Sequence, residues 1–141
     1  MIHEEICTYE VCKLAKEKGF PQQYDSLTHI YGGKDSFNVG IDLKCKKCEG
    51  TLFDISEWNP CLNDIAAPTQ SLLQRWLREE RGVIVEVFID DDSNMPLTYN
   101  IHQYKDWNWH CVCHHHGNYY AVNDWELCLE DALKYALENL V

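Results

Sequence analysis

Two cysteines separated by two residues, Cys45 and Cys48, form the sharpest chemical motif in this sequence. Two thiolates at this spacing can bind one Zn²⁺ ion in a tight turn, and Gly50 lets backbone amides approach the sulfur atoms. The motif is only half of a tetrahedral zinc site, because no second pair with matching spacing follows it. A zinc site therefore requires ligands from distant parts of the chain.

The missing zinc ligands have to come from later segments. Cys61 is the next thiol after the pair. The candidates for the fourth ligand are His110, Cys111, Cys113 and His114. Closure of this site has no support from local spacing, so an unligated, lysine-rich turn at Cys45–Cys48 is the simpler interpretation. A thioredoxin-type redox function is weaker still, because the pair does not follow a strand and begin a helix.

The segment Trp109–His116 predicts a strand with histidines on one face. The face expected in the core holds Trp109, Cys111, Cys113 and His115. The other face holds His110, Val112, His114 and His116. Neighbouring imidazoles bind Zn²⁺, Ni²⁺ or Cu²⁺, but a solvated face that binds metal only during purification is the simpler interpretation. No carboxylate is placed beside these histidines to act as a general base.

Other clusters of reactive residues have structural explanations. Three arginines recur on one side of a predicted helix, at Arg75, Arg78 and Arg81, and could bind a phosphate. Glu79 and Glu80 favour an ordinary solvated helix face instead. The acidic run 90–92 is typical of a turn. The sequence holds no glycine-rich phosphate loop, nucleophile elbow or His-Glu-x-x-His motif, and nothing selects a nucleophile among its eight cysteines.

The composition limits the classes of partner. The 141 residues include 12 Lys and Arg against 23 Asp and Glu, a net charge of −11. This charge disfavours direct binding to nucleic acid and to anionic membranes. No apolar run is long enough to span a bilayer, and the first residues lack the pattern of a secretion signal. We therefore expect a cytoplasmic protein with reduced cysteines.

The elements that must position these residues are predicted by hydrophobic periodicity. Helices are expected from Thr8 to Lys18, from Pro68 to Gly82, and from a capping box at Asn123 and Glu126 to the end of the chain. The expected strands are Val83–Ile89, Leu97–Tyr104 and Trp109–His116, with a continuation at Tyr119–Val122. A turn at 106–108 separates the last two main strands.

These elements predict an α+β fold with two layers. We expect a three- to four-stranded antiparallel meander with helices packed on one face, preceded by an N-terminal helix and an irregular region. Residues 21–67 form that region, whose short apolar pieces between glycines and prolines favour turns and a small hairpin. The whole chain, residues 1–141, is predicted to be a single domain.

Two segments, Ala67–Glu79 and Glu130–Leu137, resemble small uncharacterised proteins from prophages and mobile elements of gut Bacteroides-type bacteria. The resemblance covers roughly the last half of the chain and carries no identifiable chemistry. It implies a bacterial or phage origin and an accessory role, and it transfers no site residue. The Cys45–Cys48 pair and the run 114–116 depart from the pattern of these relatives.

The functional prediction is a non-enzymatic phage or mobile-element accessory protein that binds another protein, whose identity the sequence does not give. The exposed face of the predicted sheet is its natural binding surface. That face is expected to hold Ile84, Phe88, His102 and Tyr104. The alternatives are a zinc-stabilised binding module built on Cys45 and Cys48, an acidic mimic of nucleic acid, and a small enzyme.

Overall fold

The computed structural model has the predicted α+β class, with helices packed against antiparallel sheets. It describes residues 4–22, 27–32, 51–54, 64–90, 94–114 and 119–141. The chain divides into two compact units, Met1–Thr69 and Gln70–Val141, which we describe separately. The prediction of one domain stays a prediction. In the described part of the chain, no helix is both long and apolar enough to cross a membrane.

The first unit begins with the predicted helix α1, Tyr9–Glu17. Thr8 caps this helix, because its Oγ1 accepts a hydrogen bond from the Val11 amide (3.4 Å). Gly19 follows the helix with a φ of 96°, a conformation that only glycine adopts without strain. The buried stripe consists of Val11, Cys12 and Ala15. Sequence signals at both ends of α1 were therefore sufficient to place it.

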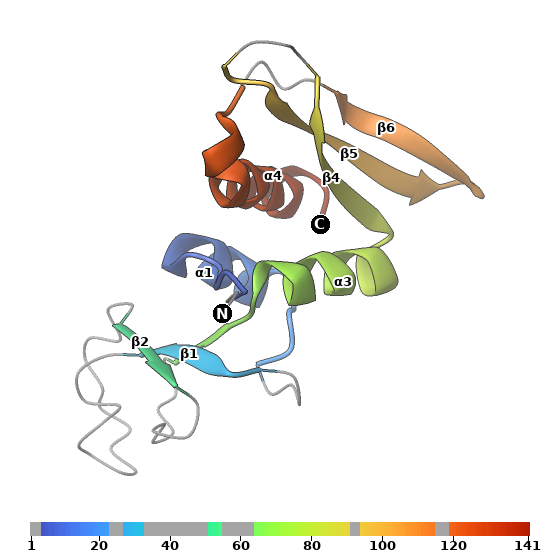
Figure 1. Ribbon diagram of the computed structural model, residues 1–141. Coiled ribbons are helices and arrows are strands. Elements are labelled where there is room, and N and C mark those ends of the chain that lie inside the picture. The colour runs from blue at the N-terminus through green and yellow to red at the C-terminus, as the bar shows by residue number, and fades with distance from the viewer. Residues whose placement is uncertain (1–3, 23–26, 33–50, 55–63, 91–93, 115–118) are drawn as a thin grey trace. The chain divides into compact units, whose positions relative to one another are not determined.

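A small sheet completes the described part of the first unit (Figure 1). Its strands are β1 (His29–Gly32), β2 (Thr51–Asp54) and β3 (Ile65–Ala67), in the order β2-β1-β3 with antiparallel neighbours. The β1–β2 pairing agrees with the predicted hairpin. Strand β3 was not predicted, because three residues are too few for a periodic signal.

The second unit starts with α3, Gln70–Arg81, which begins two residues after the proline expected at its start. Its buried side is the predicted one, with Leu72, Leu73, Trp76 and Leu77. Its solvent side carries ion pairs from Glu79 to Arg75 (3.1 Å) and to Arg78 (4.0 Å). Arg81 lies over the Trp76 ring at 5.2 Å. These contacts fit an ordinary solvated helix face rather than a phosphate site.

The sheet of the second unit is the predicted meander. Strands β4 (Val83–Ile89), β5 (Leu97–Lys105) and β6 (Asn108–His114) pair antiparallel in the order β4-β5-β6. The predicted continuation contributes one bridge, in which Tyr120 exchanges backbone hydrogen bonds of 2.8 and 3.0 Å with Leu97. The pairing fixes the register of the strands, and the register determines on which face of the sheet each side chain lies.

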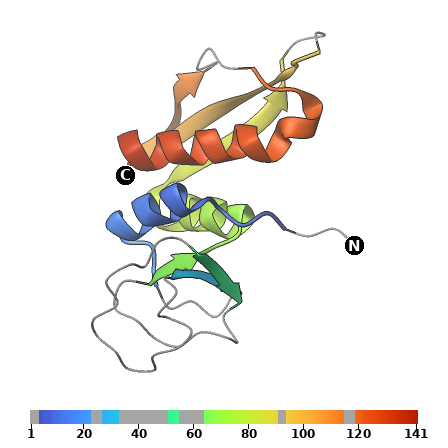
Figure 2. The same ribbon diagram turned by 90° about the vertical axis from the view of Figure 1, so that its left-hand side faces the viewer.

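Helix α4, Trp125–Asn139, covers one face of this sheet (Figure 2). Its buried stripe includes Leu129, Ala132, Leu133, Ala136 and Leu137, as the sequence predicted. The capping box at Asn123 was wrong. The chain instead enters α4 through a 3₁₀ turn, Val122–Asp124, and the N-cap Asp124 makes no capping hydrogen bond with its side chain.

A buried polar contact joins α3 to α4. Gln70 Nε2 donates hydrogen bonds to the Glu126 carbonyl (2.9 Å) and to Glu130 Oε2 (2.8 Å). Both Gln70 and Glu130 are buried. Removal of the amide takes a donor from a buried carboxylate, which is more costly than the loss of a hydrogen bond at the surface.

We therefore expect Gln70→Ala to lower the free energy of unfolding by about 2–3 kcal/mol in urea denaturation. Gln74→Ala is the matched control, since its amide donates to the Val85 carbonyl at a longer 3.3 Å and is only partly buried. The control should cost less than about 1 kcal/mol. Equal losses of unfolding free energy in the two variants would show that the buried Gln70 contact stabilises the fold no more than the partly buried Gln74 contact.

Candidate functional site

The register of β4, β5 and β6 assigns each side chain to one of two faces of the sheet. The inner face packs on α4, where Gln103 Nε2 donates to the Leu140 carbonyl (3.5 Å). Its buried residues are Val83, Val85, Leu97, Tyr99, Ile101 and Cys113. The outer face holds Ile84, Glu86, Phe88, Thr98, Asn100, His102, Tyr104, Trp109 and Cys111. The register confirms the predicted shared face, whose members were Ile84, Phe88, His102 and Tyr104.

A β-bulge in β6 breaks the alternation predicted for Trp109–His116. Ile101 pairs with Cys113 and His102 pairs with Cys111, so that Val112 is inserted between the two pairs. One inserted residue reverses the faces of all residues on one side of it, compared with strict alternation. Cys113 is buried as predicted, whereas Trp109 and Cys111 are exposed. The predicted core face was therefore wrong at these two positions.

The turn between β5 and β6 presents a tryptophan to solvent. Lys105 pairs with Asn108, which leaves Asp106 and Trp107 as a two-residue loop. Their φ angles are 53° and 66°, the signature of a type I′ turn. Glycine is favoured at the second position, and a bulky residue there is strained. Trp107 nevertheless occupies it with 88% of its surface exposed, so the side chain gains little from packing within the chain.

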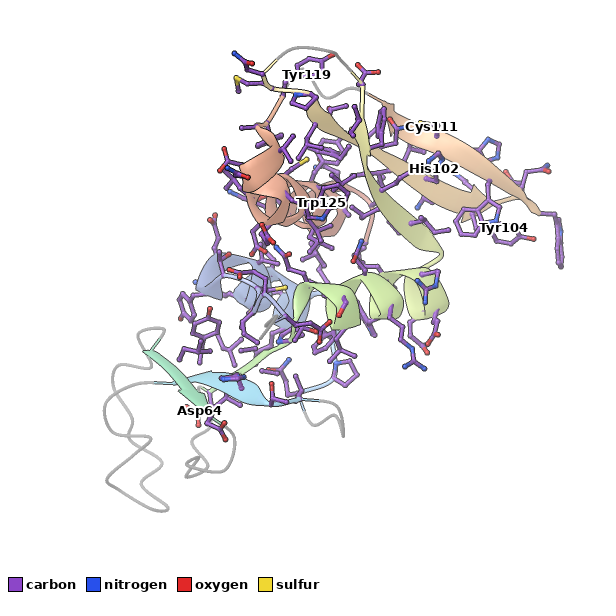
Figure 3. All side chains as sticks on the ribbon, in the orientation of Figure 1. Asp64, His102, Tyr104, Cys111, Tyr119 and Trp125 are labelled. Carbon is purple, nitrogen blue, oxygen red and sulfur yellow. The ribbon has the colours of Figure 1, made fainter. Side chains whose placement is uncertain are left out.

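Two further aromatic residues lie at the same end of the hairpin, one of them the Tyr104 labelled in Figure 3. Tyr104 and Trp109 pair across β5 and β6 with ring centroids 5.2 Å apart, and they are 44% and 48% exposed. Gly82, the residue before β4, lies close to Tyr104, since a Cβ at Gly82 would be 3.3 Å from the Tyr104 Cβ. We call Tyr104, Trp107 and Trp109 the aromatic tip.

Next to the aromatic tip, the outer face carries polar and reactive side chains. His102 Nε2 lies 3.2 Å from Glu86 Oε2 on the adjoining strand, and both side chains contact solvent. Cys111 lies opposite His102 on the other adjoining strand (Figure 3). Residues opposite each other in an antiparallel pair have Cβ atoms about 5 Å apart. Three adjacent strands therefore place a thiol, an imidazole and a carboxylate as neighbours on one face, with direct contact between the imidazole and the carboxylate.

The core between this sheet and α4 holds ionisable groups of a different kind. Burial raises the pKa of Tyr99 and of Tyr120, whose hydroxyl donates a hydrogen bond to Asp131. Burial also raises the pKa of the Cys113 thiol, with a further contribution from Cys111. Burial, reinforced by the Asp131 carboxylate, raises the pKa of Cys128 from 9.0 to about 11. These groups are neutral at pH 7, so they support the core instead of offering charged nucleophiles.

The predicted metal ligands are only partly within the described residues. Cys45, Cys48 and Cys61 lie outside them, and the zinc site stays a prediction. His110 is exposed, and its Nε2 lies 3.2 Å from the Lys105 carbonyl. His114 pairs with Asn100 in the backbone ladder, on the other side of the bulge from His110. The bulge breaks the strict alternation from which one common face for these histidines was predicted. Among the described residues, no three His, Cys, Asp or Glu side chains are placed to hold a metal ion.

Sequence reasoning missed two parts of this surface. It located the turn at 106–108 but gave no reason to expect Trp107 to be exposed. The short loop between two strands was the available signal, because residues of a two-residue loop have no cross-strand neighbour on which to pack. It also missed Glu86, which appeared only as the single polar residue in an apolar strand. Comparison of the chain with known protein families, with curated proteins and with solved structures gave no significant match.

Proposed function

We propose that this chain is a protein-binding module whose aromatic tip inserts into an apolar pocket of a basic partner protein. The observation that carries the proposal is Trp107, which has a positive φ of 66° and is 88% exposed at a turn position that favours glycine. Strained residues persist mainly at functional positions. Trp and Tyr are also the residues most enriched at the energetic centre of protein interfaces.

The architecture of the hairpin supports this role. Exposure along β5 increases from the fully buried Leu97 to the exposed Lys105, so the hairpin leaves the core toward its turn. The Tyr104–Trp109 contact fixes both rings before a partner arrives. Rings that are already ordered lose less conformational entropy on binding, which strengthens association.

Charge supports a basic partner. The net charge of −11 repels acidic surfaces and speeds encounters with basic ones. Asp106 adjoins Trp107 in the loop, and Glu86 lies on the same face as the Tyr104 and Trp109 rings. The resemblance of Ala67–Glu79 to prophage proteins supports an accessory role for this binding in a bacterial or phage setting.

Photocrosslinking in a lysate of the source cells tests the proposal. A benzophenone amino acid at position 107 should form one dominant adduct, and the captured protein should be basic. Trp125 is the matched control position, since it is also an exposed tryptophan, at 43%. It lies at the start of α4, about 22 Å along the helix from Leu140, which contacts β5. No adduct at 107, or the same adducts from both positions, would overturn the proposal.

A further inference from the structure

The structure distinguishes one cysteine from the others that it describes. Cys7, Cys12, Cys113 and Cys128 are buried, whereas Cys111 is exposed. The bulge at Val112 causes this difference, because it places Cys111 on the outer face while Cys113 stays in the core. Cys111 is thus accessible to reagents in water, and it belongs to a cluster of reactive groups rather than standing alone.

The cluster has the order nucleophile, base and carboxylate across three strands. Cys111 lies opposite His102, and His102 Nε2 lies 3.2 Å from Glu86 Oε2. When Nε2 carries the proton that Glu86 accepts, Nδ1 is the basic atom of the ring. The Cys111 thiol donates a hydrogen bond to the Cys113 carbonyl (3.6 Å) in this structure, so its proton reaches Nδ1 after the thiol rotates, through one water. A thiol beside a base that is oriented by a third group is the arrangement that activates a nucleophile.

We propose that Cys111 is a thiol-exchange site that forms a mixed disulfide with a small disulfide bearing ammonium groups. His102 takes the proton from the Cys111 thiol, and the resulting thiolate attacks one sulfur of the reagent. The bond between the two reagent sulfurs breaks, and the second half leaves as a thiolate that takes up a proton. No other oxidant is needed, because the reagent disulfide is reduced as the mixed disulfide forms.

The charge around the site selects the class of reagent. Glu86 is largely exposed beside His102, and the chain carries a net charge of −11. A negative field concentrates cationic reagents and repels anionic ones. The open face also suits a small reagent, which needs no enclosing pocket. This inference depends on the outer face alone and does not require the proposed partner.

Exchange kinetics on the reduced full chain test this site. We expect cystamine at pH 7 to modify Cys111 faster than the same cysteine in the urea-unfolded chain, as peptide mass spectrometry would show. The neutral bis(2-hydroxyethyl) disulfide should react more slowly, and the anionic dithiodiglycolate most slowly. Cys111→Ser should remove this fast reaction. Equal rates in folded and unfolded chains would overturn the proposal.

Substitutions at His102 test whether Cys111 reacts fast because a base activates it or only because it is exposed. His102→Gln should slow the Cys111 reaction at least tenfold at pH 7, within the usual range for loss of a general base. His110→Gln, which alters an exposed histidine of the same hairpin, should leave the rate unchanged. Glu86→Gln provides a second test, with a smaller loss, if His102→Gln fails to fold by circular dichroism. Unchanged rates in folded His102→Gln or Glu86→Gln would refute the role of the cluster, whatever the crosslinking at position 107 shows.

Discussion

Replacing Trp107 with glycine is expected to weaken partner binding strongly while raising the melting temperature of the protein. The ring is 88% exposed, so its removal costs little packing. Glycine adopts the φ of 66° freely, which relieves strain of about 1–2 kcal/mol but adds chain entropy to the unfolded state. The net gain should be about 0.5–1 kcal/mol, or roughly 2–6 °C by circular dichroism.

The affinity of Trp107→Gly for the partner should fall, although its melting temperature rises. Loss of a central interface tryptophan costs about 2 kcal/mol or more, which is roughly a 30-fold increase in Kd for the partner captured by crosslinking. Trp107→Ala is the matched variant, because it also lacks the ring but keeps the strained φ. It should bind as weakly as Trp107→Gly without the gain in melting temperature. Trp125→Ala should bind like the wild type.

The two measurements can fail independently. If Trp107→Gly binds as tightly as the wild type, the aromatic tip does not provide the contact. If Trp107→Gly melts no higher than Trp107→Ala, the turn is not strained by its tryptophan, and the structural argument for a functional residue is lost even if binding falls.

Alkaline solution is expected to destabilise the protein through its buried thiols. The folded protein keeps Cys128 protonated up to a pKa of about 11, against 9.0 for an unperturbed thiol. Because the folded pKa is the higher one, the stabilising contribution is complete below pH 9 and is lost as the pH rises toward 11. The difference corresponds to about 2–3 kcal/mol. Cys113 and the buried tyrosines act in the same direction, since their pKa values are also raised.

Urea denaturation from about pH 8 to about pH 10.5, with a reductant present, measures this loss as a falling free energy of unfolding. Cys128→Ala should be less stable at pH 8, because it leaves a small cavity, but its stability should fall less steeply with pH. Return to pH 8 before a second denaturation separates titration from chemical damage. Parallel pH profiles for the wild type and Cys128→Ala would contradict a titrating thiol in the core.

The sequence predicted the elements of the second unit well because two independent signals agree there. The apolar stripe of Leu72, Leu73, Trp76 and Leu77 has helical spacing, and Gly82 ends it directly before an apolar strand. The meander follows from strands joined by short turns. Strand β3 lacked both signals, because its three residues receive their order from pairing with β1.

The candidate site was harder to predict, because its geometry depends on pairing between strands. The shared face of Ile84 and His102 followed from alternation, which held along β4 and β5. Alternation failed in β6, because Val112 is an extra residue in the ladder between β5 and β6. No local sequence pattern predicts this bulge. The cluster of Cys111, His102 and Glu86 could therefore not be assembled from spacing along the chain.

The bulge also has a genetic consequence. Deletion of the single codon for Val112 would restore the regular repeat of β6 while leaving every other residue in place. With Cys113 still paired to Ile101, Cys111 would directly precede it in β6 and keep its pairing with His102, so Trp109 and Cys111 would stay on the outer face. One in-frame deletion could thus keep the chemistry of both faces, whereas loss of a residue elsewhere between Trp109 and Cys111 would turn part of the strand over.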